Sequence, residues 1–146
     1  MSKHIFWIAS FPKSGNTLLR SILTSLFFTN DGNFSFEKLK YINQFERTVH
    51  AYKNKDIFGD DLNKIGETPI FYKYLLKLQT KNILKFNEDF IFLKTHSGLF
   101  EILGSPFTVS DNTRGIIYLV RDPRDVCISW SKHLGLTIDE SIENMI

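Results

Sequence analysis

The stretch "SFPKSGNTLLR", residues 10 to 20, decides the fold of this chain. It joins an apolar run, Ile5 to Ala9, to a pattern of regularly spaced leucines and isoleucines that extends from Asn16 to Phe28. An apolar run without clean alternation is typical of a strand buried on both faces of a parallel sheet, and apolar residues three and four positions apart indicate an amphipathic helix. The stretch therefore predicts a tight loop between a buried strand and a helix.

Two further apolar runs, Phe90 to Leu93 and Gly115 to Val120, have the same character. A helical pattern from Asp122 to Lys132 follows the last of them, and "ETPIFYKYLLKLQTKN" predicts another helix with Thr68 as N-cap. Strands that alternate with helices predict an α/β fold of three layers around a mainly parallel sheet, with a P-loop-like strand–loop–helix at its start. Residues 30 to 66 are polar and irregular, which favours short helices in a lid or a substrate-facing insert.

Length and composition limit the broad class of the protein. The 146 residues predict a single domain, residues 1–146, and the net charge of +2 is too small to indicate a nucleic-acid partner. The only cysteine, Cys127, lies among apolar residues and is expected to be a buried thiol in a reducing compartment. No segment reaches the roughly 18 apolar residues of a membrane span, and no signal-peptide cleavage site follows the first apolar run. The expected location is cytoplasmic.

The loop "PKSGNT" has the features of an anion site. Backbone N–H groups of residues 14 to 17 would point out of a helix N-terminus, where the helix dipole favours negative charge. Gly15 allows close approach of the backbone, and Lys13 adds a full positive charge. The P-loop pattern of nucleoside triphosphatases needs two glycines and a lysine after the second, so such an enzyme is disfavoured here. Taken alone, the loop is equally well explained as a plain turn.

Polar side chains also follow the second apolar run, in "FLKTHSG". Lys94 and His96 are two residues apart, so on a strand they share one face at the edge where the first loop lies. A neutral imidazole in that place can serve as a general base. The other histidines, His4, His50 and His133, have no such neighbours and are expected to be structural.

The third run ends in "YLVRDPRDVCISW". Arg121 ends the expected strand and Ser129 follows eight residues later, in the next helix. An arginine can hold a phosphate through two hydrogen bonds, and a serine hydroxyl can add a third. The alternative is that the two arginines of this stretch, Arg121 and Arg124, form surface ion pairs with Asp122 and Asp125.

These three motifs, in this order and over essentially the whole chain, resemble sulfotransferases that use 3′-phosphoadenosine 5′-phosphosulfate (PAPS). The resemblance implies that Lys13 and the N–H groups of the next four residues hold the 5′-phosphosulfate; these four are Ser14, Gly15, Asn16 and Thr17. It implies that His96 removes the proton of a hydroxyl or amine acceptor and that Lys94 stabilises the transferring group. Arg121 and Ser129 would hold the 3′-phosphate. The family needs no metal, and no acidic metal-ligand cluster stands out in the sequence.

Two departures from the family pattern have consequences. Many members have a tryptophan that stacks on the adenine where this chain has Leu18. The family's later half, with an Arg-Lys-Gly loop over the 3′-phosphate, has no counterpart here, and the helical pattern runs to the last residues, "DESIENMI". The resemblance therefore predicts an apparently truncated domain, a partial sulfotransferase fold, which a homo-oligomer or a second chain could complete.

Three functions remain open from the sequence. The first is sulfuryl transfer from PAPS to a small-molecule acceptor. The second is binding of a nucleotide phosphate without turnover, by a catalytically incomplete fragment of the fold. The third and weakest is a P-loop nucleotide kinase, against which the missing glycine and magnesium ligands count. An apolar acceptor is permitted by the aromatic residues of the irregular region: Phe34, Phe36, Tyr41, Phe45, Tyr52 and Phe58.

Overall fold

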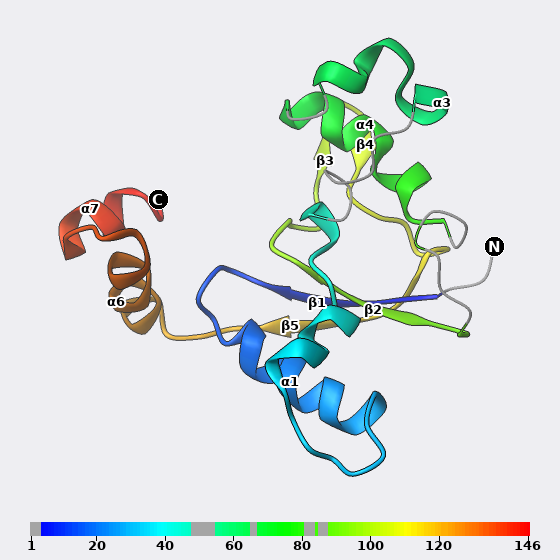
Figure 1. The fold of residues 1–146 in the computed structure, drawn as a ribbon. Helices are drawn as coiled ribbons and strands as arrows, with labels where there is room; N and C mark the ends of the chain where they lie inside the picture. The colour runs from blue at the N-terminus through cyan, green and yellow to red at the C-terminus, as the bar shows by residue number, and fades with distance from the viewer. Residues whose placement is uncertain (1–3, 48–54, 65–66, 81–83, 85–87) are drawn as a thin grey trace.

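The centre of the fold is a parallel sheet of three strands in the order β2-β1-β5 (Figure 1). The computed structural model describes residues 4–47, 55–64, 67–80, 84 and 88–146. The strands are β1 (Ile5–Ser10), β2 (Ile91–Thr95) and β5 (Thr113–Leu119). They coincide with the three apolar runs, so the expected α/β class with a parallel sheet is confirmed.

The order of the strands places a ligand crevice at the end of the sheet where the three strands have their carboxyl ends. From β1 the chain passes to β2 on one side, and from β2 it crosses to β5 on the other side of β1. Open α/β sheets bind ligands outside the carboxyl ends of the strands, at such a change of direction. The loops after β1, β2 and β5 all leave from this edge, because the three strands are parallel.

Helices cover both faces of the sheet, which confirms the expected layers. Figure 1 shows α1 (Asn16–Phe27) on one face, with the 3-10 helix η1 (Phe36–Tyr41) beside it. The other face carries α3 (Lys55–Phe58), the 3-10 helix η2 (Gly59–Lys64) and α4 (Thr68–Leu78). A short hairpin, β3 (Glu101–Ile102) with β4 (Ser105–Pro106), packs against α4 and was not expected from the sequence.

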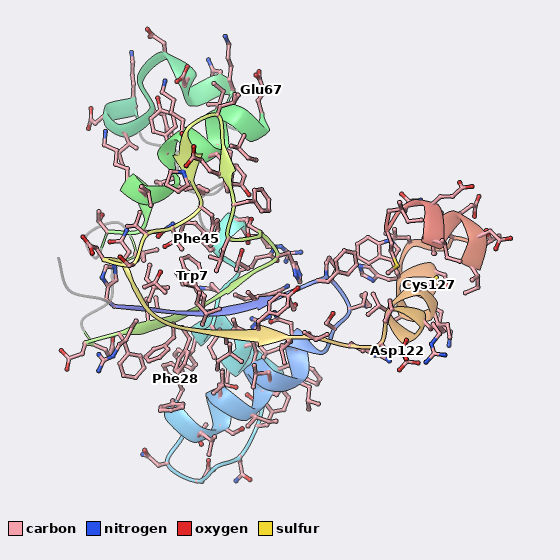
Figure 2. All side chains as sticks on the ribbon, turned by 180° about the vertical axis from the view of Figure 1, so that it is seen from behind. Trp7, Phe28, Phe45, Glu67, Asp122 and Cys127 are labelled. Atoms are coloured by element: carbon pink, nitrogen blue, oxygen red, sulfur yellow. The ribbon has the colours of Figure 1, made fainter. Side chains whose placement is uncertain are left out.

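Alternate residues of the strands supply the two apolar cores. On β1, Ile5 and Trp7 face the core under α4, whereas Ile8 faces the core under α1. Trp7 meets Phe45 edge to face, with ring centroids 5.3 Å apart, and both point into the larger core (Figure 2). Both faces of β1 are therefore buried, as its apolar run predicts.

Two helix boundaries differ from expectation. The N-cap of α4 is Glu67 in extended conformation, so Thr68 is already the first helical residue and Pro69 the second, a place where proline is tolerated. After α6 (Pro123–Leu134), the last helix α7 (Ile138–Glu143) does not run to the end of the chain. It ends because Asn144 caps it, donating its side-chain amide to the carbonyl oxygen of Glu140 at 2.7 Å.

Candidate functional site

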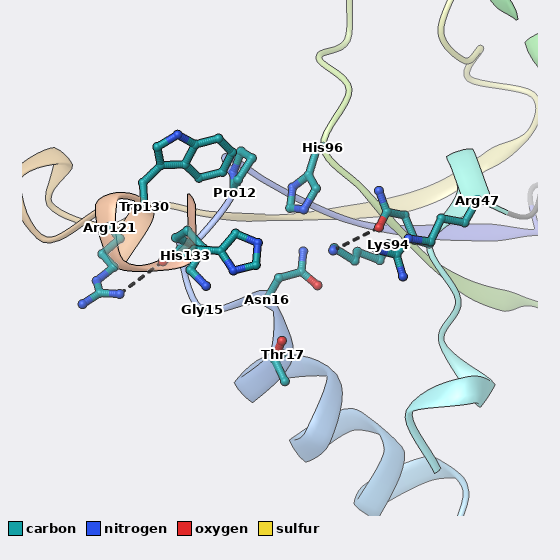
Figure 3. Close-up of a pocket in the computed structure, with 12 residues that line it drawn as sticks. Pro12, Gly15, Asn16, Thr17, Arg47, Lys94, His96, Arg121, Trp130 and His133 are labelled. Atoms are coloured by element: carbon teal, nitrogen blue, oxygen red, sulfur yellow. Dashed lines mark hydrogen bonds between the residues drawn. The ribbon is translucent and has the colours of Figure 1, made fainter. Parts of the chain in front are cut away.

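A pocket of about 540 Å³ lies at the carboxyl edge of the sheet, between the loops that follow the three strands (Figure 3). Its lining is strongly cationic, and no aspartate or glutamate belongs to it among the described residues. The residues that line it are Pro12, Lys13, Gly15, Asn16, Thr17, Gln44, Arg47, Lys94, His96, Arg121, Trp130 and His133. Seven of the nine residues expected to form the site are therefore brought together: Lys13, Gly15, Asn16, Thr17, Lys94, His96 and Arg121.

The loop after β1 has the backbone of an anion cradle. Lys13 and Gly15 both have positive φ, 66° and 102°, and alternation of such residues turns successive N–H groups toward one concave side. A Cβ added to Gly15 would meet no atom within 4 Å, so the space in front of this backbone is open. The first N–H groups of α1 have no partner within the helix, as at every helix start, and they add donors to the same place.

Two polar residues fix this loop to the sheet. The Asn16 amide donates to the hydroxyl of Ser10 at 3.1 Å, while its carbonyl oxygen is buried without a hydrogen-bond partner. The N–H of Ser14 donates to the carbonyl oxygen of Phe11 at 3.3 Å, and Ser14 lines a neighbouring cavity rather than this pocket. Asn16 thus holds the start of α1 against the end of β1, and Ser14 closes the turn that leads into it.

The imidazole of His96 is oriented for proton transfer. Its Nδ1 lies 2.7 Å from the carbonyl oxygen of Ser10, and because a carbonyl oxygen only accepts, Nδ1 carries the hydrogen. Nε2 of the neutral ring is then an acceptor. Burial lowers the pKa of His96 below its ordinary value of 6.5; Lys94 lowers it further, whereas the Ser10 carbonyl and Glu46 raise it. The ring is therefore neutral at neutral pH, as a general base must be.

Lys94 lies within the same pocket, beside its own polar partner. Its ammonium group donates to the side-chain oxygen of Gln44 at 3.4 Å. Burial lowers the pKa of Lys94, and the positive charges of Arg20 and Arg47 lower it further, while Glu46 raises it. The segment around Gln44 reaches this place because it runs parallel to the end of β2: the N–H of Lys94 donates to the carbonyl oxygen of Asn43 at 2.9 Å.

Glu46 lies beside the candidate site, and the sequence did not reveal it. One of its carboxylate oxygens accepts hydrogen bonds from the Thr95 hydroxyl, from the His96 N–H at 3.3 Å and from the Ser97 hydroxyl at 3.0 Å. Its other oxygen is buried and has no hydrogen-bond partner among the described residues. A single carboxylate therefore joins the backbone N–H of His96 to the hydroxyls of the residues before and after it. The pairing lies some 50 residues apart in the sequence, so no local pattern could show it.

The loop after β5 contributes Arg121. Its guanidinium donates to the carbonyl oxygen of Lys13 at 3.1 Å, which links this loop to the cradle (Figure 3). Its ion pair with Asp125 is long, 3.8 Å, whereas Arg124 pairs with Asp122 at 2.6 Å on the surface, away from the pocket. Ser129 is half-buried in α6 and lies outside the pocket lining, so its role stays a prediction.

The remaining histidines, Cys127 and Leu18 lie in different parts of the structure, and one histidine that was expected to be structural lines the pocket. His133 lines the pocket together with Trp130, with ring centroids 6.4 Å apart. His4 is buried and its Nε2 lies 2.8 Å from the carbonyl oxygen of Gln79, as expected of a structural histidine; His50 lies outside the described residues. Cys127 is buried as expected. Leu18, at the family's adenine-stacking position, is 68% exposed.

Over the described residues, no helix is both long and apolar enough to span a membrane. The cytoplasmic location stays a prediction.

Comparison with known proteins gives one family. No curated protein and no solved structure matches the chain. A model of the sulfotransferase domain matches residues 3–144 of the 146, which includes all three loops of the pocket. The three motifs and the sheet that presents them are thus parts of one matched domain, and the chain belongs to the sulfotransferase domain family.

Proposed function

We propose that the protein transfers a sulfuryl group from PAPS to the hydroxyl or amine of a small-molecule acceptor. The observation that carries this proposal is the orientation of His96. Its Nδ1 is committed to Ser10, and its Nε2, which has no hydrogen-bond partner in the described part of the chain, can take a proton in a pocket that also holds Lys13 and Lys94. Family membership supplies the reaction class, and the pocket supplies a base beside cationic groups that can stabilise negative charge.

The residues of the pocket fit a donor with phosphate groups at two places. At one place the cradle of Lys13, Gly15 and the start of α1 offers N–H donors and a positive charge. At the other, Arg121 offers a planar guanidinium suited to phosphate oxygens. Because the guanidinium of Arg121 donates a hydrogen bond to the carbonyl oxygen of Lys13, the two subsites are held next to each other. When bound, PAPS supplies the activated sulfuryl group.

The residues of this chain would divide the reaction between them. His96 Nε2 accepts the proton of the attacking hydroxyl or amine while that atom forms its bond to sulfur and the bond from sulfur to the bridging phosphate oxygen breaks. Lys13 stabilises the negative charge that this oxygen gains, and Lys94 stabilises the equatorial sulfuryl oxygens. The products are the sulfated acceptor and 3′,5′-diphosphoadenosine. Positioning and electrostatics supply most of the catalysis in this scheme.

A second candidate is binding of the nucleotide without turnover. Leu18 favours it, because a leucine in place of the family's stacking tryptophan offers no ring that would orient the adenine for transfer. The two functions share the cradle and differ in the use of His96, so a transfer assay on the wild type separates them.

The proposal also includes a second chain at the open side of the sheet. The outer edge of β5 has no neighbouring strand among the described residues. Three side chains at alternate positions are more than 40% exposed: Ile116 and Tyr118 within β5 and Val120 directly after it. An apolar edge strand of this kind favours association.

Calorimetric titration with 3′,5′-diphosphoadenosine tests the site independently of the chemistry. We expect saturable binding by the wild type and by His96→Ala, because His96 acts on the acceptor. Lys13→Ala should weaken binding by about 10-fold or more, since it removes a charge-assisted contact with a phosphate. Arg124→Gln, at an arginine outside the pocket, is the matched control. Unchanged binding by Lys13→Ala would show that the cradle is not the phosphate site.

A further inference from the structure

One end of the pocket is not accounted for by the proposed donor. In Figure 3, Arg121 and His133 lie at one end and Lys94 and Arg47 at the other, with His96 between them. The donor's phosphate subsites are at the Arg121 end and at the start of α1. A group that gives its proton to His96 must therefore come from the side of Lys94, where Gln44 and Arg47 form the wall.

This end of the pocket is polar rather than aromatic. None of the described aromatic residues of the irregular region lines it. Phe45 and Phe58 are buried in the larger core, and Tyr41 stacks on Phe28, with ring centroids 5.1 Å apart. Phe34 and Phe36 pack on each other, and Tyr52 lies outside the described residues. The wall that faces an acceptor is instead formed by an amide and a guanidinium.

The end of the pocket at Lys94 carries more positive charge than the carboxylates near it neutralise. Arg47 and Lys94 line the pocket together. Burial lowers the pKa of Arg20, and the charge of Arg47 lowers it further; burial likewise lowers the pKa of Lys94, with Arg20 and Arg47 adding to the effect. Glu46 offsets part of the charge around Lys94, and its accepting oxygen already accepts from Thr95, His96 and Ser97. Like charges held together cost free energy unless an anion relieves the repulsion.

We infer that the acceptor carries an anionic group, a carboxylate or a sulfate, next to the hydroxyl or amine that is sulfated, and that Arg47 binds this group. Arg47 is exposed to the pocket and its planar guanidinium matches either anion through two hydrogen bonds. Gln44 is held by Lys94, which leaves Arg47 as the group of this wall that can turn toward an acceptor. The inference rests on the proposed function, since it assigns the acceptor of the same site.

Matched ligands that differ in charge test this inference. The first series is methyl glucoside, its 6-sulfate and the corresponding methyl glucuronide; the second is 3-(4-hydroxyphenyl)propionate with its neutral amide. Binding is measured by calorimetry on protein saturated with 3′,5′-diphosphoadenosine, so that no turnover is needed. We expect the anionic member of at least one series to bind about 10- to 100-fold more tightly than its neutral counterpart, and less so at high salt. The sulfate and carboxylate arms show which anion is preferred.

Variants at Arg47 identify the residue responsible. Arg47→Gln should abolish the preference and leave the affinity for 3′,5′-diphosphoadenosine unchanged, whereas Arg47→Lys should keep part of it. Arg124→Gln, an exposed arginine outside the pocket, should change neither. Equal binding of charged and neutral ligands in both series, or a preference that survives Arg47→Gln, would overturn the inference. An anion preference without any sulfuryl transfer would instead contradict the proposed function and leave the inference standing.

Discussion

At the scale of single residues, the state of His96 follows from two contacts. The Ser10 carbonyl fixes the hydrogen on Nδ1, and burial beside Lys94 lowers the pKa of the ring. A base whose pKa is lowered stays neutral, and therefore active, to a lower pH than an unperturbed histidine would.

This gives a prediction for the pH dependence of sulfuryl transfer. As pH falls, kcat/KM should decline only when His96 becomes protonated, with a midpoint below the ordinary value of 6.5. A rate profile measured from pH 4.5 to 8 at constant ionic strength gives this midpoint. A decline centred above 6.5 would show that burial does not control the base.

Glu46 acts on His96 without touching the acceptor, so it is a positioning residue. Glu46→Ala should lower kcat by up to about 100-fold, because the His96 N–H and the hydroxyls of its two sequence neighbours lose their common acceptor. Glu46→Gln keeps an accepting oxygen but removes a charge that raises the pKa of His96, so its pH midpoint should move to lower pH.

Both Glu46 variants should bind 3′,5′-diphosphoadenosine as the wild type does. Glu37→Gln, at an exposed glutamate in η1 outside the pocket, is the matched control. A purely structural role would lower the thermal stability of Glu46→Gln and leave the midpoint of its pH profile in place.

At the scale of secondary-structure elements, the site depends on loops from parallel strands meeting at one edge. The hydrogen bond from Arg121 to the carbonyl of Lys13 joins the loop after β5 to the start of α1. The guanidinium is exposed on its remaining side and can bind a phosphate there.

Replacing Arg121 should affect one phosphate of the nucleotide more than the other. We expect Arg121→Gln to weaken binding of 3′,5′-diphosphoadenosine by about 10- to 100-fold and that of adenosine 5′-monophosphate much less. Ser129→Ala should act in the same direction with a smaller effect. Calorimetry on both ligands gives the ratio; an equal loss for the two would mean that Arg121 acts only by holding the cradle.

The elements themselves were largely predictable because their signals are local. The apolar runs located β1, β2 and β5, and leucine spacing located α1, since each pattern reports burial on a sheet or on one helix face. The N-cap of α4 was misplaced by one residue, because threonine is a preferred N-cap by residue type, whereas Glu67 holds that place without a side-chain cap hydrogen bond. The hairpin of β3 and β4 was missed, since strands of two residues carry no periodicity.

The candidate site was predictable only where its residues follow strands directly. Lys13, His96 and Arg121 stand at the ends of three parallel strands, and the sheet brings such ends together. Gln44, Glu46 and Arg47 come from a segment that reaches the pocket by pairing with the end of β2. This pairing joins residues about 50 positions apart in the sequence, so the acceptor end of the pocket could be recognised only from the structure.

At the scale of the whole molecule, the open side of the sheet is the main feature without a function. Tyr118 on the outer strand β5 is 67% exposed, and Val120, directly after this strand, is 78% exposed. No strand lies beyond β5 in the described part of the chain. Burial of such an edge against a second copy would cover apolar surface and satisfy the backbone groups of the strand.

We therefore predict self-association that depends on β5. Light scattering after size-exclusion chromatography should give a mass that rises with protein concentration, and Tyr118→Lys should reduce the rise. Leu103→Lys, at a residue 84% exposed in the turn of the β3–β4 hairpin, is the control and should not. A well-folded monomer at every concentration would contradict the prediction.

The central claim is that this pocket transfers a sulfuryl group with His96 as the base, and a transfer assay tests it most directly. The measurement is the incorporation of radiolabelled sulfate from PAPS into a panel of hydroxyl and amine acceptors, by wild type and His96→Ala at equal nucleotide occupancy. The account predicts transfer by the wild type and a loss of about 10²- to 10⁴-fold in His96→Ala, with nucleotide binding retained. Nucleotide binding without transfer to any acceptor, or full activity in His96→Ala, would contradict it.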